Sequence, residues 1–191
     1  MAFKSKYPDS AKPMRSKDDY DAYGPPGNLT LLEKELFKAA EKNDVAEAKK
    51  LIAKGAGVNA ADGVGQTALF YACWKGQLEV AELLLNHPKI NCMDRPDKWH
   101  NTALHYAACC GHLPLVELLV QKGANLQLVD KAPGYGLNAL QYAKKYHRAK
   151  VAKFLEPLMA QAAEPELLLN ELQIEDEQPS SSQDEQVLGF R

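Results

Sequence analysis

Apolar and polar residues follow the same order twice between Gly65 and Gly123. The two copies, 35 residues apart, read TALFYACWKGQLEVAELLL and TALHYAACCGHLPLVELLV. Within each copy the apolar residues return at intervals of three and four, which is the spacing of one face of a helix. Self-similarity with a period of about 20 to 50 residues is typical of stacked supersecondary units. The pattern therefore predicts a repeat protein.

Each copy predicts two helices joined by a tight turn. Thr67 and Thr102 can cap the first helix by accepting backbone N–H bonds. Gly76 and Gly111 then allow that helix to end in a left-handed residue, and a second apolar stretch follows. One unit of this size cannot enclose its own apolar face, so neighbouring units are expected to stack.

Less faithful copies of the pattern lie on both sides. Thr30 and Glu33 form a capping box, which predicts a helix from about Leu31. The copy that follows is rich in Lys and Glu, as suits a first repeat whose outer face meets water. After the two clear copies, Asn138 stands at the capping position of a fourth copy and His147 replaces its turn glycine.

At these residues the chain resembles the ankyrin-repeat family. The family core T-P-L-H-x-A-A-x-x-G-H corresponds here to TALFYACWKGQ and TALHYAACCGH, with Ala68 and Ala103 in place of the proline. The resemblance extends from Leu29 to about Leu158. It implies an all-α fold, a solenoid of helix-turn-helix units joined by hairpin-like loops.

The chain is predicted to have four parts. They are an irregular arm, a repeat domain, a short helix that either caps the last repeat or binds a partner, and a disordered acidic tail. Their boundaries are expected at 1–28, 29–160, 161–175 and 176–191. The four repeats are expected at about 29–61, 62–96, 97–132 and 133–160. Pro157 is expected to end or kink the last helix of the domain, and Pro165 to stand in the first turn of the short helix.

The net charge of −2 conceals an acidic C-terminal part, since Glu164 to Arg191 contains eight acidic residues and one Arg. The slight basic excess of the repeat domain is too small to indicate nucleic acid. No apolar run is long enough for a membrane span, and nothing near Met1 resembles a signal peptide. We therefore expect a soluble monomer with a protein partner, and no nucleic acid or membrane.

The cysteines favour free thiols. Cys73, Cys92, Cys109 and Cys110 form no CxxC pair, and the vicinal pair cannot easily bridge without strain. Reduced thiols are typical of the cytoplasm or nucleus, so the cytoplasm is the expected location.

No pattern indicates an active site. The sequence contains no Gly-rich phosphate loop, GxSxG or HExxH, and no Cys–His pair at a known local spacing. His105 and His112 occupy positions where, in the ankyrin family, the imidazole ties neighbouring turns together. We expect no catalytic residue, no metal, no cofactor and no enzymatic activity.

The resemblance places partner binding at the loop fingertips and on the exposed side of the first helix of each repeat. Tryptophan and tyrosine there would dominate the binding energy. The alternative is that Trp74 packs on the adjacent inner helix and Trp99 on its own loop. The candidate partner-binding residues are Gln66, Trp74, Lys75, Lys98, Trp99, Asn101, Cys109, Tyr135, Leu137, Lys145 and Tyr146.

These features favour a non-catalytic protein-binding module that uses its concave groove. The alternative is a type IV secreted bacterial effector that binds a host protein through the same groove. That hypothesis rests on the acidic, Ser- and Gln-rich tail with Leu188 near its end, which is similar to C-terminal translocation signals. A third hypothesis places an enzyme or enzyme-inhibitor activity in the arm or tail.

Overall fold

A computed structural model describes residues 29–131 and 136–172 of the chain, with side chains described as far as Ala160. The predicted arm and acidic tail lie outside these residues, as does Tyr135. The contact pattern divides the chain between Glu156 and Pro157, and the account below concerns the first of the two units unless stated.

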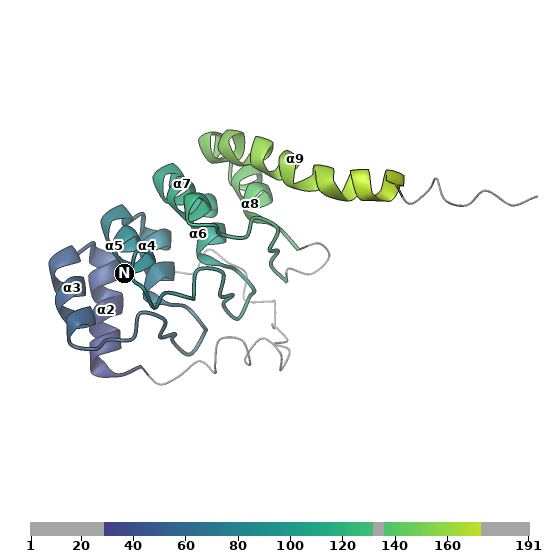
Figure 1. The fold of residues 1–191 in the computed structure, drawn as a ribbon. Coiled ribbons are helices and arrows are strands. Elements are labelled where there is room, and N and C mark those ends of the chain that lie inside the picture. The colour runs from purple at the N-terminus through teal and green to yellow at the C-terminus, as the bar shows by residue number, and fades with distance from the viewer. Residues whose placement is uncertain (1–28, 132–135, 173–191) are drawn as a thin grey trace, which may run out of the picture. The chain divides into compact units, whose positions relative to one another are not determined.

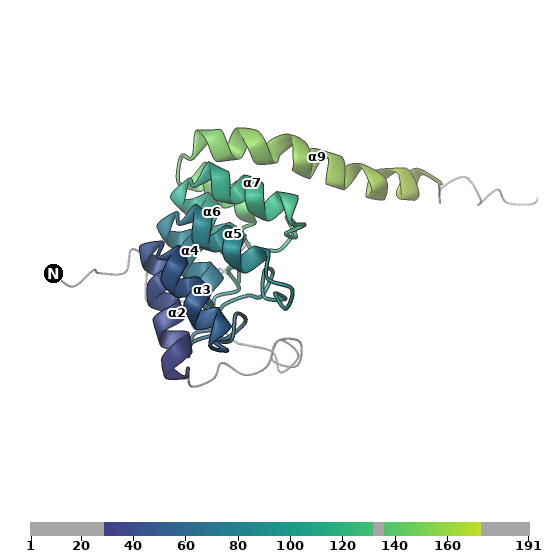
Figure 2. The same cartoon turned by 60° about the vertical axis from the view of Figure 1, so that its left-hand side comes forward.

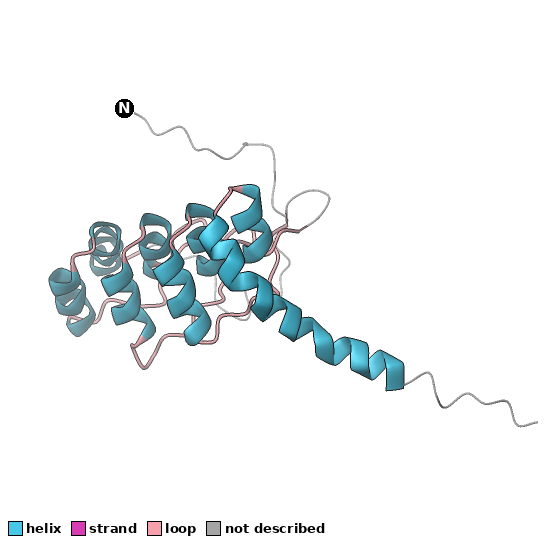
Figure 3. Ribbon diagram, turned by 90° about the horizontal axis from the view of Figure 1, so that it is seen from above, coloured by secondary structure: helices cyan, strands magenta, loops and turns pink. Residues whose placement is uncertain are grey.

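The described residues form helices and loops, with a single isolated β-bridge between Ala61 and Thr67 (Figure 3). This confirms the predicted all-α solenoid of helix-turn-helix units. In chain order the helices are α2 (Leu31–Lys42), α3 (Val45–Ala53), α4 (Ala68–Lys75), α5 (Leu78–Leu85), α6 (Ala103–Cys110), α7 (Leu113–Gln121), α8 (Ala139–Lys145) and α9 (Ala149–Leu172).

The helices form two rows. The inner row consists of α2, α4, α6 and α8, each in contact with the next, and the outer row of α3, α5 and α7 is stacked in the same way. Figure 1 shows the pairs side by side, and Figure 2 turns the outer row toward the viewer. The long loops between pairs all extend from the same end of the rows. These loops are called fingers below.

Side-chain caps fix where the inner helices begin. The backbone N–H of Glu33 donates to Thr30 Oγ1 at 3.4 Å, and Glu33 Oε2 accepts from the Thr30 N–H at 2.7 Å. The predicted capping box and the helix start at Leu31 are therefore confirmed. Asn138 caps α8 in the same way, as predicted, with the Gln141 N–H donating to its side chain at 2.9 Å.

The turns after the inner helices use left-handed residues. Gly76 and Gly111 both have φ of 84°, and Asn43 and His147 take the same turn position in the first and fourth repeats with φ of 59° and 56°. The predicted replacement of the turn glycine by His147 is confirmed. At Gly111 a side chain would also collide, because a Cβ would lie 2.7 Å from Cδ of Arg148.

The core lies between the two rows. Leu69 and Leu104 of the inner row are buried together with large leucines of the outer row, such as Leu84 and Leu119. The alanines of the inner helices are also fully covered, and their small size allows neighbouring inner helices to approach closely. They include Ala72, Ala107, Ala108 and Ala143.

Pro157 was predicted to end or kink the last helix, and it does not end it, because α9 continues through Pro157 and Pro165 to Leu172. The alternative, a kink at Pro157, stays a prediction. A proline removes one helical hydrogen bond and crowds the preceding turn, at a cost of about 3 kcal/mol. Pro157 is exposed, and the residues that follow it are mostly Ala, Leu, Glu, Met and Gln, which are strong helix formers. The predicted domain boundaries stay a prediction.

Candidate protein-binding site

A buried aspartate organises the finger of the third repeat. Asp97 Oδ1 accepts from the backbone N–H groups of Trp99 at 2.8 Å and Asn101 at 2.9 Å. Its Oδ2 accepts from the Tyr106 hydroxyl at 2.8 Å. Because Tyr106 lies on α6, the carboxylate holds the fingertip against the inner helix of its own repeat.

The same arrangement recurs in two other fingers. Asp62 accepts from Tyr71 of α4 at 3.2 Å, and Asp130 accepts from Tyr142 of α8 at 2.6 Å. The sequence analysis did not single out these aspartates. A signal was available, since Asp62 and Asp97 are 35 residues apart, which is the period of the repeat.

Burial sets the protonation of these pairs. The Asp97 side chain is almost fully covered, and this burial raises its pKa while the hydrogen bonds from Tyr106 and the backbone act in the opposite direction. Burial, followed by the charge of Asp62, raises the pKa of Tyr71 to about 12. The Tyr71 phenol therefore keeps its proton at neutral pH and remains a donor.

The predicted structural role of His105 and His112 is confirmed. His105 Nδ1 lies 2.8 Å from Thr102 Oγ1, and its Nε2 lies 3.1 Å from the Leu137 carbonyl in the next finger. Burial lowers the pKa of His105, which favours the neutral ring. His112 Nε2 lies 3.3 Å from the carbonyl of Trp74 in the preceding repeat.

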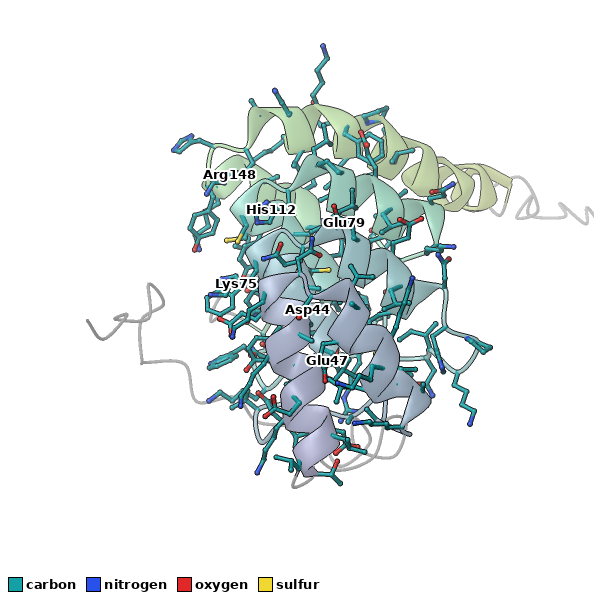
Figure 4. All side chains as sticks on the ribbon, turned by 90° about the vertical axis from the view of Figure 1, so that its left-hand side faces the viewer. Asp44, Glu47, Lys75, Glu79, His112 and Arg148 are labelled. Carbon is teal, nitrogen blue, oxygen red and sulfur yellow. The ribbon has the colours of Figure 1, made fainter. Side chains whose placement is uncertain are left out.

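Each turn supports the end of the preceding inner helix. Gln77 donates to the Glu41 carbonyl at 2.9 Å, and Arg148 Nε donates to the Cys109 carbonyl at 2.8 Å. These bonds satisfy carbonyls that a helix end leaves without an intrahelical partner. Figure 4 shows Lys75, His112 and Arg148 succeeding one another along the stack at these turns.

Trp74 lies at the end of α4 with 44% of its surface exposed. Its ring meets the ring of Tyr71, on the same helix, edge-on at a centroid distance of 6.5 Å. Lys75 Nζ lies 4.6 Å from the Trp74 ring and forms an ion pair with Glu41 at 2.9 Å. A large part of the indole is therefore available to a partner.

Trp99 is half-buried at the tip of the third finger. Lys98 Nζ lies 4.1 Å from its ring centroid. The finger is tied to both neighbours, since the Lys98 N–H donates to the Val64 carbonyl at 2.9 Å and the Lys131 N–H donates to the Trp99 carbonyl at 3.3 Å. The backbone at Trp99 is therefore held by hydrogen bonds to the fingers on both sides.

Tyr146 follows α8 and is also half-buried. Its ring is stacked on Tyr142 with a centroid distance of 6.1 Å and an interplanar angle of 10°. Lys145 Nζ lies 5.8 Å from the Tyr146 centroid. Three candidate aromatics thus have a neighbouring lysine against the ring. The inner surface is defined below as these three pairs: Trp74 with Lys75, Trp99 with Lys98, and Tyr146 with Lys145.

The remaining candidates are less accessible. Gln66 already bridges two repeats, donating to the Tyr106 hydroxyl at 3.2 Å, and Asn101 and Leu137 are half-buried in the fingers. The expectation that Cys109 is exposed is wrong, because only 7% of it is accessible. Its short side chain and Tyr142 line the same small cavity.

An open pocket that sequence reasoning missed lies at the first-repeat end of the inner helices. Its volume is about 360 Å³, and Leu31, which is 74% exposed, forms part of its wall. Glu41 and Tyr71 line the pocket and also contact the Trp74–Lys75 pair, so the two features are continuous. The pocket is lined by Leu29, Leu31, Lys34, Glu35, Phe37, Lys38, Glu41, Asp62 and Tyr71.

The described part of the chain gives little support for a metal site, a membrane span or a reactive thiol. There, no three His, Cys, Asp or Glu side chains gather as metal ligands would, and no helix has the length and hydropathy of a membrane span. The four cysteines are free thiols, and burial raises the pKa of Cys73 and Cys92. Raised thiol pKa values disfavour the nucleophilic thiolate.

Comparison with known proteins identifies the family. A family described as ankyrin repeats, in three copies, matches residues 36–130 and 90–162. The chain belongs to the ankyrin-repeat family, as the sequence motifs predicted. Ankyrin repeats are a non-catalytic protein-protein interaction module, so the protein has a module of that class.

The relatives are large proteins that contain such repeats. Diacylglycerol kinase zeta of Rattus norvegicus is 30% identical over 64% of this chain and 13% of its own length. Ankyrin repeat domain-containing protein 63 of Homo sapiens is 37% identical over 49% of this chain and 24% of its own length. The E3 ubiquitin-protein ligase hecd-1 of Caenorhabditis elegans is 30% identical over 77% of this chain and 5% of its own length. The chain thus matches less than a quarter of each of these relatives.

Proposed function

We propose that the protein binds a protein partner through the inner surface and the adjoining fingertips, along the concave groove of the repeats. The observation that carries the proposal is the exposure of Trp74, which is 44% accessible at the end of a mostly buried helix. Exposed aromatic side chains at fixed positions are the residues that contribute most to protein interfaces.

The rigidity of the surface supports this proposal. Trp99 is held by the Asp97 carboxylate and by backbone bonds to both neighbouring fingers. Tyr146 is held by its stacking on Tyr142. A surface that is already ordered loses little conformational entropy when a partner binds.

We propose no catalytic role for this unit. His105 and His112 are engaged in structural bonds, and burial raises the pKa of the Cys73 and Cys92 thiols. The reducing cytoplasm expected from the cysteines remains part of the proposal, as does a monomeric state.

Replacing Trp99 by alanine tests the proposed surface. With a partner captured on the wild-type protein, Trp99→Ala is expected to weaken binding by about 2 kcal/mol or more, because a buried aromatic anchor is lost. The dissociation constant is measured by calorimetry, and thermal melts check that the variant is folded.

Lys153→Ala is the control for this experiment, because Lys153 is exposed on α9 and should not affect binding. Normal binding by Trp99→Ala, together with loss of binding when residues 164–191 are deleted, would show that recognition lies in the tail and not in the inner surface.

The effector hypothesis rests on tail residues outside the described part of the chain. No structural observation favours it, and it remains a prediction of the sequence.

A further inference from the structure

Positive charge is concentrated in the last repeat of the unit. Residues 131–156 contain six basic residues and one acidic residue, Glu156, whereas acidic and basic residues almost balance over residues 29–130. Lys144 forms an ion pair with Glu156 at 2.9 Å, and the count of residues leaves a net positive charge in this repeat. The basic residues, all exposed, are Lys131, Lys144, Lys145 and Arg148, together with Lys150 and Lys153 on α9, which are not part of the inner surface.

Two lysines of the inner surface, Lys98 of the third repeat and Lys145 of the fourth, lie against aromatic rings. Among the described residues, no carboxylate forms an ion pair with Lys98 or Lys145, and each ammonium group lies against an aromatic ring. Asp97 and Asp130, in the third and fourth fingers, are buried and accept from tyrosine hydroxyls. A partner with carboxylates could therefore bind these lysines without displacing an internal ion pair.

The opposite end of the same surface is a pocket whose wall combines apolar side chains with charged ones, namely Lys34, Glu35, Lys38, Glu41 and Asp62. The pocket at α2 has Leu31, Phe37 and Tyr71 in its wall and continues into the Trp74–Lys75 pair. Its volume of about 360 Å³ is enough for a large apolar side chain. The surface therefore has a pocket with apolar side chains in its wall in the first repeat, and cationic sites toward the fourth.

The distance between the two ends fixes the length of an occupant. Neighbouring packed helices lie roughly 8–10 Å apart, so the three steps from α2 to α8 cover roughly 24–30 Å. An extended chain advances about 3.3 Å per residue, so about eight or nine residues span the surface.

We propose that the partner presents an extended acidic segment to the inner surface. The segment places an apolar side chain in the pocket at α2 and carboxylates at Lys98 and Lys145. This inference rests on the proposed function and specifies the chemistry of its partner.

The structure favours an acidic peptide over a nucleic acid or an anionic membrane. The lysines of the inner surface occur about once per repeat, a spacing that suits separate carboxylates better than a continuous line of phosphates. The outer helices carry exposed or half-exposed carboxylates, among them Glu47 and Glu79, which repel an extended polyanionic surface (Figure 4).

Selection from a random peptide library tests the proposal. The full chain is immobilised and used to enrich displayed peptides of about 12 residues, a length that exceeds the estimated span. The enriched peptides are expected to share a net negative charge and a large apolar residue. Their binding should weaken about tenfold in Lys98→Glu/Lys145→Glu, and it should also weaken as the salt concentration rises from about 0.05 to about 0.5 M.

The matched control is Lys49→Glu/Lys89→Glu, which makes the same change in charge at exposed lysines away from the inner surface and should leave binding within about twofold. Enriched peptides that require Trp74 and Trp99 but carry no net negative charge would overturn this inference and leave the proposed function intact. Acidic peptides whose binding is unchanged in Trp74→Ala/Trp99→Ala would overturn both.

Two further probes separate the sources of negative charge. A single-stranded oligothymidylate and phosphatidylserine vesicles are titrated against the wild type and Lys98→Glu/Lys145→Glu. If either probe binds through these lysines while no acidic peptide is enriched, the surface recognises phosphate and the inference is wrong. The expected result is that neither probe shows lysine-dependent binding.

Discussion

Replacing Leu104 by alanine is expected to lower the free energy of unfolding by about 2–5 kcal/mol. Leu104 is 2% exposed and lies on α6, which contacts α4 on one side and α8 on the other. Truncation leaves a cavity at the centre of the stack, where close-packed neighbours on both sides can collapse only in part. The effect is measured by chemical denaturation followed by circular dichroism.

The control for Leu104→Ala is Lys49→Ala, on the exposed side of α3, which should change the free energy of unfolding by no more than about 0.5 kcal/mol. Equal losses of stability in the two variants would contradict the claim that the repeats share one core.

Replacing Asp97 by alanine is expected to destabilise the protein by about 3–5 kcal/mol. The change leaves the Tyr106 hydroxyl and the backbone N–H groups of Trp99 and Asn101 without their shared acceptor. Asp97 is 1% exposed, so water reaches these donors only if the finger opens. The raised pKa of Asp97 shows that burying the charge has a cost, which limits the net loss.

Tyr106→Phe is the matched control for Asp97→Ala. It removes the bond from the tyrosine hydroxyl to Asp97 and the bond from Gln66 to that hydroxyl, but keeps the backbone bonds of the carboxylate, so it should lower the free energy of unfolding by about 1–2 kcal/mol. If Asp97→Ala costs no more than Tyr106→Phe, the aspartate does not organise the finger.

Local sequence signals predicted the helices well. The capping box at Thr30 and the turn residue His147 act through atoms within a few residues, so their effect can be read from adjacent positions. The 35-residue period extended this reading to the stack, because each repeat can bury its apolar face only against the next one.

The register of the repeat predicted where a residue lies on its helix better than it predicted how exposed the side chain is. Trp74 and Cys109 are equivalent by the period, but the indole extends past its neighbours whereas the short thiol stays buried beside Tyr142. Exposure at a given position depends on side-chain length and on the next repeat, and a repeat motif specifies neither.

The pocket could not be predicted from the sequence because its walls are distant in the chain. Leu31 begins α2, and Tyr71 lies in the next repeat, on α4. Their proximity depends on how far the two inner helices are separated, which the side chains of both repeats determine together. The continuation of α9 through Pro157 was missed for another reason, since helix formers on both sides outweighed a single breaker.

Tryptophan fluorescence tests the central claim most directly, because the chain contains two tryptophans, Trp74 and Trp99, and both belong to the inner surface. A tryptophan-free partner or selected peptide is titrated while emission is recorded and calorimetry confirms binding, with Trp74→Phe and Trp99→Phe separating the two signals. The account predicts a saturable blue shift as the indoles leave water, with the same midpoint as the calorimetric isotherm. Saturable binding with no change in the emission of either tryptophan would contradict it.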